Sequence, residues 1–290
     1  MEFLRPATWE AALAAKAAHR DAVPIAGGTD VMVELNFDRR RPPVLLDLTA
    51  IPELTEWGGD GTLLRVGAGV SYTRIIAELG DRLPGLAMAA RTVGSPQIRN
   101  RGTVGGNLGS ASPAGDAHPP LLASDAVVEV ASVRGTRQIP VTEFFTGVKR
   151  SLLAPDELIA AFRIPPADGP QQFAKVGTRN AMVIAVCSFA LALHPSAGAV
   201  GTGIGSAAPT PRRATQAEEF LAGELLWESR LPLSDAVVDR FGELVASAAD
   251  PIDDVRGTAD YRRHALAVMA RRTLRWAWHE YREGGTRRCA

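Results

Sequence analysis

At 290 residues the chain is long enough for about two domains, and its formal net charge is zero. A neutral chain has no overall field that would draw it to nucleic acid or to an acidic membrane surface. Its two cysteines, Cys187 and Cys289, form no C-x-x-C pair, which excludes an iron–sulfur cluster ligated by this chain alone and fits a reducing compartment.

The first half of the chain alternates short apolar strands with helices. Thr8 and Ser71 precede helical segments and have side chains of the kind that cap helix N-termini. Arg134 and Gly135 predict a hairpin turn between two strands. We expect helices over residues 8–19, 31–35, 71–79, 84–92 and 118–124, and strands over residues 23–25, 44–48, 63–66, 126–131, 137–141 and 157–164.

The segment PPADGP, residues 165–170, opposes both helix and sheet and is the predicted domain boundary, with domains over residues 1–168 and 169–290. Three strands followed by three helices predict a small α+β unit after it. The strands are expected over residues 172–177, 183–193 and 200–204 as an antiparallel meander, and the helices over residues 214–222, 234–249 and 259–283, the last capped by Thr258.

No targeting or membrane signal is visible in the sequence. The first residues, MEFLRPATWEAALAAK, lack the apolar core of a signal peptide. The longest apolar run, residues 182–193, is too short to span a bilayer. We therefore expect a cytoplasmic protein that binds neither nucleic acid nor a membrane.

Two loops with paired glycines are the best candidates for a ligand site. Residues 26–30, AGGTD, lie between a strand and a helix, where backbone N–H groups bind anions. Residues 94–116, GSPQIRNRGTVGGNLGSASPAGD, have no helical or strand periodicity and are too long for a simple connection, so we expect an irregular binding loop. Because glycines let a backbone bend and approach a ligand closely, the two loops predict a site for a dinucleotide pyrophosphate, with Asp116 accepting from a ligand hydroxyl.

Other features leave alternatives open. The first glycine pair taken alone is more often an ordinary tight turn than a ligand site, and neither the Rossmann nor the P-loop glycine pattern occurs. Arg99 and Arg101 either neutralise phosphate or face solvent or a partner chain. The five histidines form no spaced cluster, and Cys187 lies in an apolar strand, so we expect no metal site and no cysteine nucleophile.

These motifs resemble those of one family. Residues 24–31, PIAGGTDV, and residues 98–116, IRNRGTVGGNLGSASPAGD, are similar to the two flavin-binding motifs of the FAD-binding medium subunit of the molybdenum hydroxylases, which include xanthine dehydrogenase and aerobic carbon monoxide dehydrogenase. The segments KVGTR (175–179), GSAAPTPR (205–212) and RGTADYR (256–262) resemble the family's C-terminal domain. The resemblance covers nearly the whole chain, and its details are most similar to flavin subunits of bacterial xanthine dehydrogenase.

The resemblance implies an α+β fold, with a two-part FAD-binding domain of the vanillyl-alcohol-oxidase (PCMH) type. The smaller C-terminal domain would be of the carbon monoxide dehydrogenase flavoprotein kind, with a three-stranded antiparallel sheet and a helix bundle. The residues that the resemblance assigns to FAD are Pro24, Ile25, Ala26, Gly27, Gly28, Thr29, Asp30, Val31, Val93, Thr103, Val104, Gly105, Gly106, Asn107, Asp116, Ile159 and Lys175.

The sequence departs from related flavoproteins at two places. Some members of the broader fold tether FAD through a histidine, but Thr29 occupies the first loop here and the second has no histidine before His118, so we expect non-covalent FAD. Val183 stands where many relatives have an acidic residue, which leaves open whether residues 180–185 contact the flavin ring.

The resemblance also implies electron transfer rather than proton abstraction, so no catalytic acid or base is expected in this chain. A molybdopterin subunit would oxidise xanthine or hypoxanthine, and a [2Fe-2S] subunit would pass electrons to FAD, which would deliver a hydride to NAD⁺. The expected complex is a dimer of heterotrimers. Carbon monoxide or an N-heterocycle as the substrate, and oxygen or a quinone as the acceptor, remain open. A stand-alone flavoprotein oxidoreductase and a non-enzymatic nucleotide-binding protein are further alternatives.

Overall fold

The computed structural model describes residues 1–284, so Cys289 lies outside the described residues. Local signals begin several helices, because the side chains of Thr8, Ser71 and Thr258 each accept a hydrogen bond from the backbone N–H three residues ahead, as predicted. The helices are α1 (Trp9–Ala18), α2 (Val31–Asn36), α3 (Tyr72–Glu78), α4 (Pro84–Thr92), α5 (Pro96–Arg101), α6 (Val104–Ser110), α7 (His118–Ala123), α8 (Val141–Phe144), α9 (Thr215–Glu224), α10 (Asp235–Ser247) and α11 (Ala259–Arg282), with 3-10 turns η1 (Pro52–Thr55) and η2 (Pro195–Ala197).

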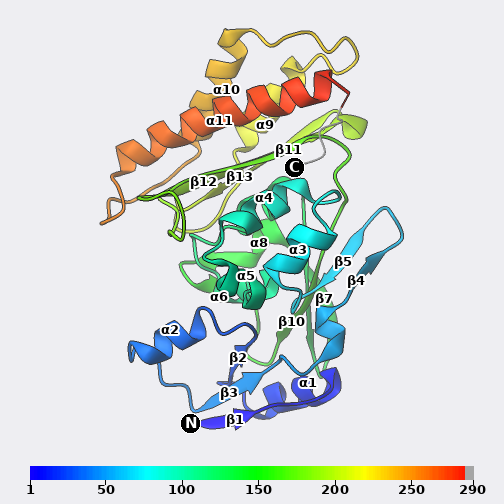
Figure 1. Ribbon diagram of the computed structural model, residues 1–290, viewed down its shortest axis with the longest axis vertical. Helices are drawn as coiled ribbons and strands as arrows, with labels where there is room; N and C mark the ends of the chain where they lie inside the picture. Colours follow the sequence, from blue (N-terminus) through cyan, green and yellow to red (C-terminus); the bar gives the residue numbers. More distant parts are fainter. Residues whose placement is uncertain (285–290) are drawn as a thin grey trace.

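The strands form separate sheets along the long axis of the molecule (Figure 1). A small parallel sheet at the N-terminal end has the order β1-β3-β2, and an antiparallel sheet in the middle has the order β4-β5-β10-β6-β7. The strands are β1 (Glu2–Leu4), β2 (Val23–Ile25), β3 (Val44–Asp47), β4 (Trp57–Gly59), β5 (Leu64–Gly67), β6 (Val127–Ser132), β7 (Gly135–Pro140), β8 (Phe145–Gly147), β9 (Arg150–Ser151), β10 (Leu158–Ile164), β11 (Gln171–Val176), β12 (Cys187–His194) and β13 (Ala199–Gly205).

The third sheet, β11-β12-β13, is antiparallel and lies between two layers of helices (Figure 1). The C-terminal helices α9, α10 and α11 cover one face, and α4 and α7 pack on the other. Gly201 and Gly203 in β13 allow this second contact, since a Cβ atom there would lie 1.9 and 2.0 Å from the carbonyl oxygens of Ala123 and Pro119 in α7. The predicted α+β class, with a three-stranded antiparallel sheet and helices at the C-terminal end, is confirmed.

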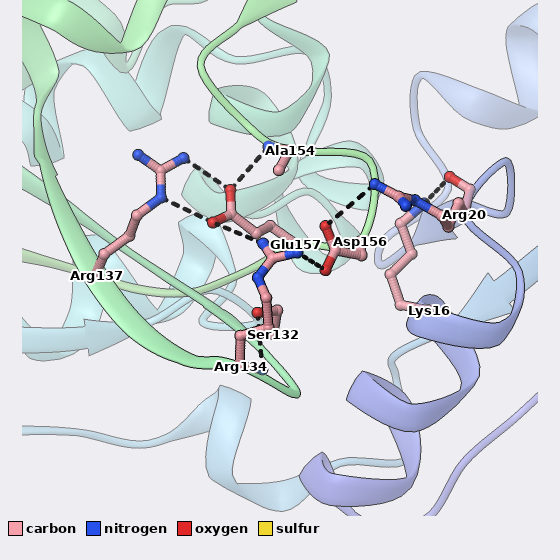
Figure 2. A network of polar contacts seen from close by, with 8 residues as sticks. All are labelled: Lys16, Arg20, Ser132, Arg134, Arg137, Ala154, Asp156 and Glu157. Atoms are coloured by element: carbon pink, nitrogen blue, oxygen red, sulfur yellow. Dashed lines mark hydrogen bonds and ion pairs between the residues drawn. The ribbon is translucent and has the colours of Figure 1, made fainter.

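A polar network joins the N-terminal part to the five-stranded sheet (Figure 2). Asp156, in the turn before β10, pairs with Arg134 of the β6–β7 hairpin and lies 3.8 Å from Arg20, which follows α1. The next residue, Glu157, accepts two hydrogen bonds from Arg137, at 2.7 and 2.8 Å. Both carboxylates are largely buried, so charge-assisted hydrogen bonds fix the hairpin to the turn before β10, and the ion pair of Arg20 adds a weaker connection to the end of α1.

The strand expected over residues 183–193 is wrong at its beginning, because β12 starts at Cys187. Its partner strand β11 ends at Val176, and the last backbone hydrogen bond of this pair runs from Val186 to that residue. Residues before Val186 therefore have no strand to pair with. Met182 adopts a positive φ of 50° and Ile184 is exposed, although both are apolar.

Candidate functional site

The two glycine loops touch one another. The first loop leaves β2 at Ile25 and enters α2 at Val31. A Cβ atom at Gly27 would lie 1.9 Å from the carbonyl oxygen of Arg101, at the end of α5. Only glycine permits this approach, so the first loop is seated directly on the backbone of the second.

Two of the four paired glycines, Gly27 and Gly105, are required by the close approach of another backbone segment rather than by unusual backbone angles. Among the four glycines of the two glycine pairs, Gly28 alone has a left-handed φ, at 77°. At Gly105 a Cβ atom would lie 2.4 Å from the Ala68 carbonyl oxygen, in the turn between β5 and α3. Part of the predicted role of these glycines is therefore to let three backbone segments meet.

The prediction of an irregular loop over residues 94–116 is wrong, because this segment contains α5 and α6. Ser95 caps α5, with Pro96 at its first position, and Thr103 caps α6 by accepting from the Gly106 N–H at 2.8 Å. Glycines on both sides of α5 and within α6 obscured these short helices. The first turn of α6 leaves the N–H groups of Val104 and Gly105 without an acceptor inside the helix.

Asp116 and Lys175 form a buried ion pair beside these loops. The Lys175 ammonium in β11 lies 2.6 Å from Asp116 Oδ2 and also donates to the Thr92 carbonyl oxygen at 3.3 Å. Burial raises the pKa of Asp116, against the opposing effect of Lys175. The second carboxylate oxygen, Asp116 Oδ1, is buried and has no hydrogen-bond partner in the protein. It is therefore available to a ligand that can donate a hydrogen bond.

His118 holds α6 in the second loop by a hydrogen bond, a role that the sequence did not indicate. Its Nε2 lies 3.1 Å from the Asn107 carbonyl oxygen, and the Asn107 side-chain oxygen accepts from the Ala117 N–H at 3.3 Å. Burial lowers the pKa of His118 to about 4, so the imidazole is neutral at physiological pH and donates from Nε2. Its ring also contacts Phe145, with 4.5 Å between the ring centroids.

Ile159 and Val93, two further predicted FAD-binding residues, lie next to the second loop. Ile159 is buried in β10, and its Cδ1 would lie 3.7 Å from a Cβ atom at Gly109 of α6. Val93 ends α4, and its carbonyl oxygen accepts from Arg99, which also donates to the Gly94 carbonyl oxygen. Arg99 thus holds its own loop, whereas the Arg101 side chain is exposed.

Residues 1–284 contain surface hollows but no candidate metal cluster and no helix suited to span a membrane. No group of three or more His, Cys, Asp or Glu side chains there is arranged to hold a metal ion, and none of the helices is both long and apolar enough to cross a membrane. Two surface hollows, of about 410 and 340 Å³, are lined by residues of the C-terminal helices and neighbouring turns and lie away from the glycine loops.

Comparisons with known proteins match both halves of the chain. The family model for the FAD binding domain in molybdopterin dehydrogenase matches residues 1–167, and the model for the CO dehydrogenase flavoprotein C-terminal domain matches residues 172–277. The nicotinate dehydrogenase FAD-subunit of Eubacterium barkeri is 36% identical over 256 residues, covering 82% of this chain and 86% of that protein.

Two further relatives match over most of their length. The putative xanthine dehydrogenase FAD-binding subunit of Escherichia coli is 30% identical over 282 residues, covering 93% of each protein. In a solved structure of carbon monoxide dehydrogenase from Hydrogenophaga pseudoflava, one chain superimposes with a TM-score of 0.88 at 28% identity, covering 96% of this chain and 97% of that one.

Proposed function

This chain belongs to the family of FAD-binding domains of molybdopterin dehydrogenases, and from that premise we propose that it takes up electrons from a partner subunit and passes them on from FAD. The family membership makes it an FAD-binding subunit of an oxidoreductase. The observation that supports the proposed site most strongly is the contact between the two glycine loops at Gly27 and Arg101.

The residues present fit an FAD molecule. Two loops that meet through glycine backbone offer N–H groups to a diphosphate, including those in the first turn of α6. The buried, unpartnered Asp116 Oδ1 suits a ligand hydroxyl. The proposed FAD-binding residues are Pro24, Ile25, Ala26, Gly27, Gly28, Thr29, Asp30, Val31, Val93, Thr103, Val104, Gly105, Gly106, Asn107, Asp116, Ile159 and Lys175.

When bound, FAD supplies the redox chemistry, because it accepts electrons singly and gives them up as a pair. The chain itself binds FAD, orients it and shields it from solvent. Lys175 holds Asp116 by an ion pair, and His118 holds Asn107 by its carbonyl oxygen, so two of the proposed FAD-binding residues are positioned by contacts within the protein. We propose that the cofactor is non-covalent, since Thr29 lies in the first loop where a tethering histidine would be needed.

The partners that we propose are a [2Fe-2S] subunit and a molybdopterin subunit, assembled as a dimer of heterotrimers in the cytoplasm. A relative's name supports a complex of several subunits. The medium chain of carbon monoxide dehydrogenase from Hydrogenophaga pseudoflava is 29% identical to this chain, and a medium chain belongs to an enzyme with other chains. The proposed substrate of the complex is xanthine or hypoxanthine, and the proposed acceptor is NAD⁺.

A second candidate substrate is a pyridine-type N-heterocycle. The nicotinate dehydrogenase FAD-subunit is 36% identical to this chain, against 30% for the putative xanthine dehydrogenase subunit, although over fewer residues. The substrate would bind another subunit, so the residues of this chain do not discriminate between the two.

The test begins with the full chain purified on its own and then with its co-purifying partners. We expect flavin absorbance that is released into solution on acid denaturation, and one larger and one smaller partner recovered from the native host with a tagged chain. The complex should oxidise xanthine faster than nicotinate with NAD⁺ as acceptor; the reverse order would favour the second candidate. A colourless chain that takes up no added FAD would contradict the proposal, and substrate turnover without partners would favour a stand-alone oxidoreductase.

A further inference from the structure

Tyr72 is a buried aromatic residue at the point where the two glycine loops meet. It is the first residue of α3 and only 3% exposed. Its backbone N–H donates to the Gly102 carbonyl oxygen at 3.0 Å, and its ring lies against Gly102, where a Cβ atom would be 3.2 Å from Cδ2. Gly102 directly follows Arg101, whose carbonyl oxygen contacts the first loop at Gly27. The ring therefore lies beside the junction of both loops.

The hydroxyl group of Tyr72 makes no hydrogen bond to any residue within 1–284. Burial raises the pKa of Tyr72 well above its usual value, and the carboxylates of Asp116 and Asp30 raise it further. The hydroxyl is therefore protonated at physiological pH and can donate a hydrogen bond. The side chain as a whole is buried, but its hydroxyl oxygen is not enclosed by protein atoms, so this unpaired donor is open to a ligand that supplies an acceptor.

The surroundings select the chemistry of that ligand. Asp116 Oδ1 is a buried acceptor without a partner, and Asp30 lies in the first loop. Two carboxylates disfavour a phosphate oxygen at this position, because like charges repel strongly away from water. A neutral hydroxyl group both accepts from a phenol and donates to a carboxylate, so it satisfies the two unpartnered groups together.

We propose that Tyr72 is a further FAD-binding residue, whose hydroxyl donates to a sugar-type hydroxyl of the dinucleotide while Asp116 accepts from the same part of the ligand. The inference rests on the proposed function, since it requires FAD in this site. Sugar-type hydroxyls occur both in the ribityl chain and in the adenosine ribose of FAD. Tyr72 positions the cofactor and takes no part in electron transfer.

The test compares the flavin-free full chain with its Tyr72→Phe variant, titrated with FAD and followed by quenching of flavin fluorescence. We expect FAD to bind about tenfold more weakly to the variant, the loss typical of one hydrogen bond. The phenyl ring is retained, so the melting temperature of the flavin-free variant should not fall. Tyr261→Phe is the matched control, because Tyr261 is 49% exposed and far along the chain in α11, and it should bind FAD normally.

Two fragments of FAD locate the contacted hydroxyl. FMN contains the ribityl chain and ADP contains the ribose, and each can be measured by competition with FAD. The fragment whose affinity falls in Tyr72→Phe contains the partner hydroxyl. A combined Tyr72→Phe/Asp116→Asn variant should lose less affinity than the two single losses multiplied, since both groups contact the same part of the ligand.

Three results would overturn the inference. Unchanged FAD affinity in Tyr72→Phe would remove the hydrogen bond, while leaving the proposed function intact as long as the unaltered chain binds FAD. A lower melting temperature of the flavin-free variant, with unchanged affinity, would give the hydroxyl a structural role instead. Weaker FAD binding without any change for FMN or ADP would exclude a sugar hydroxyl as the partner. An unaltered chain that binds no FAD would instead remove the proposed function, and the inference with it.

Discussion

At the scale of single residues, the site depends on glycines that leave room for a neighbouring backbone and on a carboxylate oxygen that is free to bind a ligand. Gly27 and Gly105 have no side chain where another backbone passes, and Asp116 has a carboxylate oxygen with no partner in the protein. The first feature allows the loops to meet, and the second leaves a polar group for a ligand. Both can be tested by substituting one residue at a time.

Replacing Gly27 by alanine should weaken FAD binding by roughly tenfold or more. The added methyl group would overlap the Arg101 carbonyl oxygen, and relieving an overlap of this kind costs about 1–3 kcal/mol. FAD titration of the flavin-free chain measures the effect. Gly58→Ala is the matched control, because a Cβ atom at Gly58 meets nothing within 4 Å. Equal affinities in the two variants would show that contact between the loops does not shape the site.

His118 should make the protein less stable in acid. Its pKa is about 4 in the folded protein and near 6.5 when unfolded, so the folded state favours the neutral imidazole. This contribution is complete above pH 6.5 and is lost as the pH falls through 4, amounting to about 3 kcal/mol of unfolding free energy. Urea unfolding from pH 7 to pH 4 should show the loss in the unaltered chain. His118→Gln should show a smaller loss, while Asp116 titrates in both; parallel curves would contradict this account.

At the scale of elements, the Asp116–Lys175 pair connects β11 to the loop that follows α6. The two side chains are 9% and 7% exposed, so neither charge is stabilised by water. Lys175 also donates to the last turn of α4 through the Thr92 carbonyl oxygen. One lysine therefore ties a strand of the C-terminal sheet to two elements around the proposed cofactor site.

Removing only one partner of this pair should be more harmful than removing both charges. Lys175→Met leaves a buried carboxylate unpaired, which costs about 3 kcal/mol of stability. In Lys175→Met/Asp116→Asn the carboxylate is also neutralised, so most of the stability should return. Urea unfolding of the flavin-free chains measures this, and Lys149→Met, at an exposed surface pair, serves as the control. A double variant that is as unstable as the single one would contradict the buried-charge explanation.

At the scale of the whole molecule, the two loops belong to different parts of the fold. The first loop extends from the N-terminal parallel sheet, and the second packs with α3 and β10 (Figure 1). The site therefore requires these parts to keep a fixed relation. The network of Asp156 and Glu157 with three arginines provides one such connection (Figure 2).

Asp156→Asn should loosen the N-terminal part without unfolding the rest. The neutral amide loses the ion pairs to Arg134 and Arg20, so the amides of α1 should exchange with solvent faster while those of β10 and β12 do not. Hydrogen–deuterium exchange of the full chain resolves these segments. Asp260→Asn, at a side chain that is 99% exposed, is the control. Unchanged exchange in α1 would mean that apolar packing alone holds this part in place.

The sequence by itself determined most of the local structure and the family. Capping residues such as Thr8 and Thr258 begin helices through contacts three residues away, and the motifs around Gly27 and Gly105 are contiguous, so both are readable along the chain. The α+β fold class, the FAD cofactor and the family were predicted from these local signals and motifs. The helices α5 and α6 were missed because the glycines that flank α5 and those inside α6 outweighed short capping signals.

The tertiary structure decided which distant atoms meet. Lys175 contacts Asp116 across 59 positions, Gly27 contacts Arg101, and Tyr72 lies against Gly102. No local sequence pattern predicts any of these three contacts. Likewise, the sequence showed His118 but not its neutral state, which results from complete burial beside Asn107. Periodicity and capping act over one or two helical turns, whereas burial and long-range contacts depend on how whole elements pack.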